Sequence, residues 1–231
     1  MNPPAGARPG PRLTFAIEEA GPLVPAAVPT LRFGLRIEDS GSADIRSVAL
    51  NAQVRIAATR RRYDKRDEER LVELFGRPEQ WARSLQSLHW TNVPLQVAPF
   101  TGTTLVDLPV PCTYDLDVTA ARYFHALTDG EVPLEFLFSG SLFYATENGL
   151  RVAPLAWDRE AEVRMPVAVW RAAMDRHFPD SAWLRISRKS FDALHAYKAR
   201  NAMMSWEEAV ESLLRAAGEA EPGAGEETPE R

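Results

Sequence analysis

The segment that could best recognise a partner is a run of basic residues near position 60. Residues 60–66 carry five cations around one tyrosine. Guanidinium groups bind carboxylates and phosphates through paired hydrogen bonds, so this run could hold an acidic group of another molecule. Basic runs are also common in solvated loops, and the carboxylates of residues 67–69 would offset part of the charge. The residues predicted to contact a partner are Arg60, Arg61, Arg62, Tyr63 and Arg66.

Two further side chains could extend such a surface. Trp90 follows a histidine, and His125 ends a Tyr-Phe-His sequence. An aromatic ring and an imidazole are frequent recognition groups, although a hydrogen-bonded histidine at a strand edge is the simpler interpretation. We include both residues in the predicted partner-binding surface.

A nucleophilic site would have to use Cys112, the single cysteine of the chain. A reactive thiol needs a nearby base or cation to lower its pKa, and the residues around Cys112 supply neither. Free cysteines are more often buried than reactive. An enzyme with a dispersed site, in which the fold brings Cys112 to His125 and Asp115, stays as an alternative.

The sequence predicts no metal or cofactor. The four histidines lack the i, i+4 spacing of helical metal ligands, and a single cysteine cannot build a tetrahedral zinc site. Aspartates at positions 107, 115, 117 and 129 lack the glycine-punctuated loop of an EF-hand. Phosphate-binding and nucleophile-elbow glycine motifs are also missing from the sequence.

Composition limits the class of protein. A chain with 45% hydrophobic residues and a net charge of -5 is globular, and its charge disfavours a nucleic-acid binder. No apolar run is long enough for a signal peptide or a membrane span, so we predict a cytoplasmic protein that does not enter a membrane.

Hydrophobic periodicity predicts the elements that must position these groups. Alternation at residues 13–17, 31–37 and 48–56 indicates strands, and strand character returns at 103–110, 114–118, 134–144 and 150–157. A helical period over 65–75 indicates a short inserted helix, with a further turn at 79–85. The pattern past residue 166 is helical, and Ser205 with Glu208 forms a capping box for the last helix.

These elements predict a mainly β, α+β fold: an antiparallel β-sandwich of about seven or eight strands with an inserted short helix and a C-terminal helical layer. The expected organisation is a disordered tail over 1–11, a sandwich over 12–165 with the helical insertion near 64–85, a helical portion over 166–215 packed on the sandwich, and a disordered acidic tail over 216–231.

Short motifs spread over the folded part resemble those of an uncharacterised actinobacterial protein family. They include Leu74-Phe-Gly, Phe100-Thr-Gly-Thr, Asp107-Leu-Pro-Val-Pro-Cys-Thr-Tyr-Asp, Pro133-Leu-Glu-Phe-Leu-Phe-Ser-Gly and Met174-Asp-Arg-His-Phe-Pro. Members of that family tend to be encoded beside genes for uptake nickel-iron hydrogenases. The resemblance implies an accessory role for that enzyme, with a hydrogenase subunit or a maturation factor as partner.

The sequence therefore favours a non-enzymatic accessory or protein-binding protein. A small-molecule carrier is a second alternative, because the stripe of Phe136, Phe138 and Phe143 could line a cavity between two sheets. An ordinary close-packed core explains the same three residues. The sequence does not indicate an oligomeric state.

Overall fold

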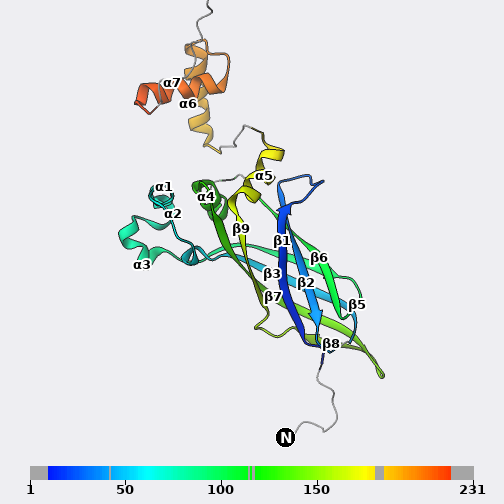
Figure 1. The fold of residues 1–231 in the computed structure, drawn as a ribbon. Coiled ribbons are helices and arrows are strands. Elements are labelled where there is room, and N and C mark those ends of the chain that lie inside the picture. Colours follow the sequence, from blue (N-terminus) through cyan, green and yellow to red (C-terminus); the bar gives the residue numbers. More distant parts are fainter. Residues whose placement is uncertain (1–9, 42, 114, 116–117, 180–184, 220–231) are drawn as a thin grey trace, which may run out of the picture. The chain divides into compact units, whose positions relative to one another are not determined.

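Figure 1 shows the computed structural model of the protein, which describes residues 10–41, 43–113, 115, 118–179 and 185–219. The chain forms two compact units, residues 1–183 and residues 184–231. Most of the two predicted tails, residues 1–9 and 220–231, lies outside the described residues. The predicted start of the acidic tail at residue 216 is too early, because the last helix continues to Ala217.

The smaller of two sheets contains three antiparallel strands in the order β1-β2-β6. Their bounds are Leu13–Pro22 for β1, Thr30–Asp39 for β2 and Thr103–Pro111 for β6. The side chains of Leu31, Phe33, Leu35 and Ile37 are fully buried, as their alternation predicted. The opposite face carries ion pairs, including the pairs of Arg32 with Glu19 and Asp107.

The larger sheet contains six strands, with β7 at its centre. The order is β4-β3-β7-β8, while β5 pairs with β3 and β9 pairs with β7. The bounds are Asp44–Ile56 for β3, Leu88–Val97 for β4, Phe100–Thr101 for β5, Glu131–Thr146 for β7, Gly149–Pro154 for β8 and Glu160–Pro166 for β9. One side of β7 pairs with β3, and its other side pairs first with β9 and then with β8.

Aromatic rings join the two sheets into a sandwich. Phe15 of β1 stacks on Phe138 of β7, with ring centroids 4.5 Å apart, and Phe33 of β2 meets Phe136 of β7 edge-on at 5.1 Å. Phe136 and Phe138 therefore fill the space between the sheets, where a carrier would need a cavity. Phe143, the third member of that stripe, lies half-buried on the other face of β7.

Helices close one end of the sandwich (Figure 1). Between β3 and β4 lie short helices at Ala58–Arg60 (η1), Lys65–Arg70 (α1), Val72–Phe75 (α2), Pro78–Gln80 (η2) and Trp81–Ser84 (α3). Helix α4 spans Thr119–Ala126 and α5 spans Val167–His177. Phe124 of α4 stacks on Trp170 of α5, with centroids 5.4 Å apart, so the two helices share one aromatic cluster.

The second unit contains helices α6 (Arg188–Arg200) and α7 (Trp206–Ala217). Ser187 caps α6, and Ser205 forms the predicted capping box with Glu208 at the start of α7. Each helix therefore begins where its own sequence specifies. Among the helices of the described part, none is both long and apolar enough to cross a membrane.

The predicted mainly antiparallel α+β sandwich is confirmed, with nine strands in the described residues rather than seven or eight. Strands β4, β5 and β9 were not predicted. The predicted strand over 114–118 falls partly on residues 114, 116 and 117, which lie outside the described residues, and Asp115 and Val118 are not in a strand. Helix α4 begins directly after them.

Candidate functional site

The basic run alternates between solvent and interior as it leaves the sandwich. Strand β3 ends at Ile56, Ala57 and Ala58 are buried, and Arg60 and Arg62 are exposed. Between these exposed residues, the side chain of Arg61 is only 6% exposed. The run therefore divides into one buried arginine and a set of exposed cations, a division that its composition did not indicate.

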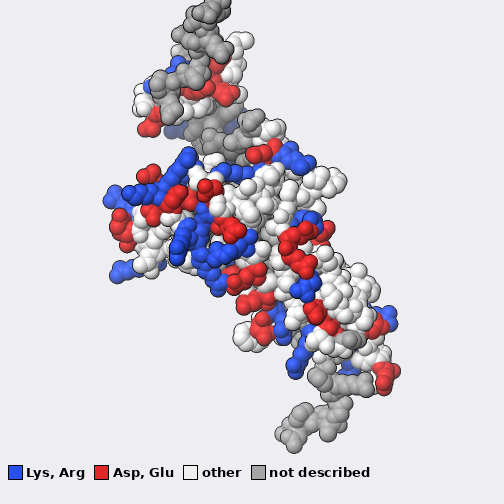
Figure 2. Space-filling view, in the orientation of Figure 1, with Lys and Arg blue, Asp and Glu red and all other residues white. Residues whose placement is uncertain are grey.

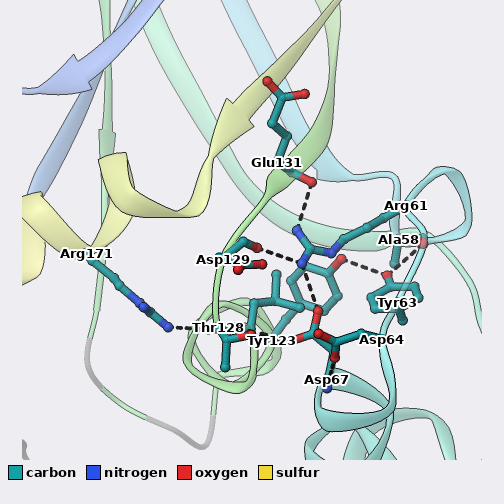
Figure 3. A network of polar contacts seen from close by, with 11 residues as sticks. Ala58, Arg61, Tyr63, Asp64, Asp67, Tyr123, Thr128, Asp129, Glu131 and Arg171 are labelled. Atoms are coloured by element: carbon teal, nitrogen blue, oxygen red, sulfur yellow. Dashed lines mark hydrogen bonds and ion pairs between the residues drawn. The ribbon is translucent and has the colours of Figure 1, made fainter.

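Arg61 anchors a network of polar contacts (Figure 3). Its Nη2 donates to Oδ2 of Asp67 at 2.8 Å and to the carbonyl oxygen of Asp129 at 2.7 Å. Its Nη1 donates to the carbonyl oxygen of Glu131 at 2.9 Å. Gly130 lies between these two carbonyls with φ of 76°, and a Cβ there would approach the guanidinium to 3.4 Å. Glycine adopts this positive φ without strain, and the resulting turn orients the carbonyl oxygens of Asp129 and Glu131 toward the guanidinium of Arg61.

Asp67 is the partner that makes burial of Arg61 possible. Its side chain is 3% exposed, and its Oδ1 accepts hydrogen bonds from the backbone N and from Oγ1 of Thr128, both at 3.2 Å. The carboxylate of Asp64 caps helix α1 by accepting from the backbone N of Asp67 at 2.7 Å. The pair therefore ties the helical insertion to the turn before β7.

Two tyrosines extend the network inward. Tyr63 Oη donates to the carbonyl oxygen of Ala58 at 2.7 Å, which leaves Tyr123 Oη to donate to Tyr63 Oη at 2.8 Å. Burial raises the pKa of Tyr63 to about 12 and raises the pKa of Tyr123 further. Both phenols stay neutral at physiological pH, so they serve as hydrogen-bond donors rather than as acids or bases.

A groove of about 400 Å³ opens over this network. We call it the arginine groove, and its lining residues are Arg60, Arg61, Arg62, Asp64, Asp67, Asp129, Gly130, Glu131 and Arg164. Arg62 and Arg164 have no ion pair or side-chain hydrogen bond to another residue that the structure describes. Figure 2 shows cations and carboxylates interleaved on the visible face of the molecule. The groove thus offers two unpaired guanidinium groups in a mixed-charge setting.

Arg60 stands between the arginine groove and a smaller hollow of about 170 Å³. Its guanidinium pairs with Glu162 of β9 at 2.5 Å and with Glu135 of β7 at 3.3 Å. The hydrogen bond to Glu162 is the main cause of the raised pKa of Arg60. The guanidinium of Arg60 therefore already forms ion pairs with carboxylates of its own chain, whereas those of Arg62 and Arg164 do not.

The other predicted recognition residues do not join this network. Arg66 is exposed on α1, and His125 is exposed on α4. Trp90 is half-buried in β4, where its ring lies 4.8 Å from that of Phe124. Packing against the core accounts for Trp90. Sequence analysis did not assign five residues of this network and groove to a site, although it considered Asp129 as a metal ligand: Asp67, Thr128, Asp129, Glu131 and Arg164.

Cys112 lies away from solvent just after β6. It is 8% exposed, and its Sγ contacts the carbonyl oxygen of Val110 at 3.6 Å. Burial raises the pKa of the Cys112 thiol to about 12, so the thiolate is scarce at neutral pH. In the part of the chain that the structure describes, no three His, Cys, Asp or Glu side chains are grouped as metal ligands would be.

Comparisons with solved structures find distant likenesses. A crystal structure of a protein from Bordetella pertussis described as ApaA is 13% identical, with a TM-score of 0.23 over 67% of this chain and 94% of the other. A β-glucosidase from Kluyveromyces marxianus is 10% identical, with a TM-score of 0.23 over 68% of this chain and 15% of the other. These scores are too low to support a fold or a function.

A search of the curated proteins finds no match to this chain. A family model described as "Family of unknown function (DUF6084)" matches residues 10–222, which includes the whole sandwich and both helices of the second unit. The chain therefore belongs to the DUF6084 family.

Proposed function

We propose that the chain is a non-enzymatic protein-binding protein that uses the arginine groove to hold an acidic group of another protein. The observation that carries the proposal is that Arg62 and Arg164 are unpaired and lie next to the buried Arg61–Asp67 ion pair, which holds the base of the groove in place. A fixed floor matters because a preorganised site loses little side-chain entropy when a partner binds.

The mixed charge of the groove favours a protein over a nucleic acid. Arg62 and Arg164 can each take a carboxylate through two parallel hydrogen bonds. Asp129 and Glu131 line the same groove, and their negative charges would repel a run of phosphates. A protein surface can present both signs of charge, so that acidic side chains meet the two arginines and a basic one meets Asp129 or Glu131.

The sequence resemblance described above suggests where to look for the partner. An accessory role beside an uptake nickel-iron hydrogenase would make a hydrogenase subunit or a maturation factor the first partner to test. Such a role needs no chemistry from this chain, and it would place the protein in the cytoplasm. The buried, protonated thiol of Cys112 fits a role in which the chain binds rather than reacts.

The test is affinity purification of the full tagged chain from its native host under hydrogenase-inducing conditions. The variant R62E/R164E reverses both unpaired cations, and R151E reverses an exposed arginine on β8 as a control outside the groove. We expect hydrogenase subunits or maturation factors with the natural chain and with R151E. The double variant should retain at least about tenfold less, since rim charge reversal opposes association.

Two outcomes would contradict the proposal. One is recovery of the same partners at the same level with R62E/R164E, which would show that the groove is not used. The other is a bare protein in every sample after a mild wash. Circular dichroism spectra of the variants must match that of the natural chain, so that loss of binding is not loss of fold.

A further inference from the structure

The second unit carries an apolar surface that its own helices do not cover. Residue Ala209 is buried, but the larger apolar side chains of α7 are 41–45% exposed: Trp206, Val210, Leu213 and Leu214. They recur at three- and four-residue intervals, as in a helix that packs one face against a partner. Phe191 of α6 adds a further 44% exposed ring beside Trp206, with centroids 5.3 Å apart.

Helix α6 contacts Trp206 and the side of α7 that carries Ser212, and it covers only part of this stripe. Tyr197 Oη of α6 and Ser212 Oγ of α7 are 2.8 Å apart, and Ala209 lies on the same side of α7. At about 100° per residue, Leu213 lies about 40° around the helix from Ala209, whereas Val210 and Leu214 lie about 100° and about 140° from it, away from that contact. Figure 1 shows the two helices crossing within the unit rather than lying side by side. A crossing of this kind leaves most of the stripe open.

Among the described residues of the second unit, Ala209 is the one fully buried apolar residue. The single cysteine of the chain lies in the other unit, so no disulfide supports the two helices. A small unit with so little core usually needs a disulfide, a metal or association. Its helices are nevertheless well specified by their caps, and Gly218 closes α7 in the left-handed conformation with φ of 76°. Association is the means of stabilisation that fits these facts.

The charges of the two helices suit pairing between copies. Helix α6 contains four cations and one carboxylate, whereas α7 contains three carboxylates and one cation. In a two-fold dimer the same patch faces itself, so α6 of one copy can lie against α7 of the other. That arrangement covers the apolar stripe and brings opposite charges together around it.

The exposed apolar area is sufficient for a dimer. Five large side chains, each about two-fifths open, expose on the order of 300–500 Å² per copy if each side chain spans about 150–250 Å². Interfaces are about 60% apolar, so the patch corresponds to roughly 500–900 Å² buried per copy, which reaches the range of stable interfaces.

We propose that the open face of α7, together with α6, is a homodimer interface that joins two copies of this chain. The proposal is independent of the arginine groove, which lies in the other unit. The partner is a second copy of this chain, because pairing of the basic α6 with the acidic α7 needs both helices on each side of the interface.

The experiment is sedimentation velocity of the full chain over a concentration series. We expect a species at twice the 25.8 kDa mass of one chain. L213E places a charge in the stripe and should weaken the dimer at least about tenfold. L150E changes a 63% exposed leucine of β8 and should leave the dimer intact.

A charge-swap pair separates pairing between copies from a local folding defect. R188E/K189E reverses two cations of α6, and E207K/E211K reverses two carboxylates of α7. Each variant alone should dimerise weakly, and a mixture of the two should form the heterodimer, because opposite charges then meet across the interface. A monomer at every concentration, or a dimer that L150E weakens and L213E does not, would overturn the proposal.

Discussion

Removal of the Asp67 carboxylate should destabilise the protein more than the loss of any exposed ion pair. In D67A the guanidinium of Arg61, only 6% exposed, would keep two carbonyl partners but lose its counter-charge. Thr128 would lose the acceptor for both its backbone N and its Oγ1. Breaking a buried pair from one side costs about 3–5 kcal/mol, whereas exposed pairs contribute about 0–1 kcal/mol.

A double-mutant cycle isolates the pair itself. R61M and D67L each leave one buried charge without its partner, but R61M/D67L leaves neither. We therefore expect each single variant to lose about 3–5 kcal/mol and the double variant to lose clearly less than the sum. The free energies of unfolding come from urea titration followed by tryptophan fluorescence, with far-ultraviolet circular dichroism as a second probe.

Exposed Arg46 and Asp44 provide the matched control, because their ion pair at 2.8 Å has side chains that are 56% and 50% exposed. D44A should change the free energy of unfolding by less than about 1 kcal/mol. The reasoning would be refuted if D67A cost no more than D44A, or if the effects of R61M and D67L simply added. Either result would mean that the network seen in Figure 3 does not hold the helical insertion to the sandwich.

Three further predictions concern other buried groups. The pKa of Tyr63 rises from 10.0 to about 12 on folding, so its contribution to stability is full below pH 10 and is lost toward pH 12. Urea titrations between pH 10 and pH 12 should show that the free energy of unfolding falls by on the order of 1–2 kcal/mol, after allowance for solvent screening. The fall should be smaller in Y63F, and an equal fall in Y63F would show that Tyr63 is not its source. Cys112 should react with a thiol reagent at neutral pH only after denaturant is added, and fast labelling of the native protein would refute its burial. Thermal unfolding should show G140A to be strongly destabilised, because a Cβ there would lie 2.0 Å from the carbonyl oxygen of Ala49, whereas G21A meets nothing within 4 Å and should melt near the natural chain.

The strands that could be predicted from the sequence are those with one buried and one exposed face, because their residues alternate between apolar and polar. Alternation in β2 and β3 identified the buried residues because one face of each strand meets the core. Strand β4 escaped prediction because Pro94 and several polar residues interrupt its pattern. Proline is tolerated there because β4 is an edge strand, where a missing N–H need not break the ladder.

The division within the basic run could not be predicted from local sequence. Arg60, Arg61 and Arg62 are the same residue type in succession, and only the middle one is buried. Its carbonyl partners at residues 129 and 131 come from a turn nearly 70 residues later in the chain. The segment was therefore identified from charge alone, while the role of each arginine depends on non-local contacts.

The central position of β7 has a consequence for how the chain folds. Strand β7 pairs with β3, although about 75 residues separate the end of β3 from the start of β7. Strands β8 and β9 pair with β7, so they can join the sheet only after β7 has paired. Closing so long a loop before any pairing is gained makes folding slow. During synthesis, β1, β2 and β3 leave the ribosome well before β7, which pairs with β3 and supplies Phe136 and Phe138 to pack on β2 and β1. Part of the apolar surface of these three strands therefore lacks its packing partner until β7 has been made.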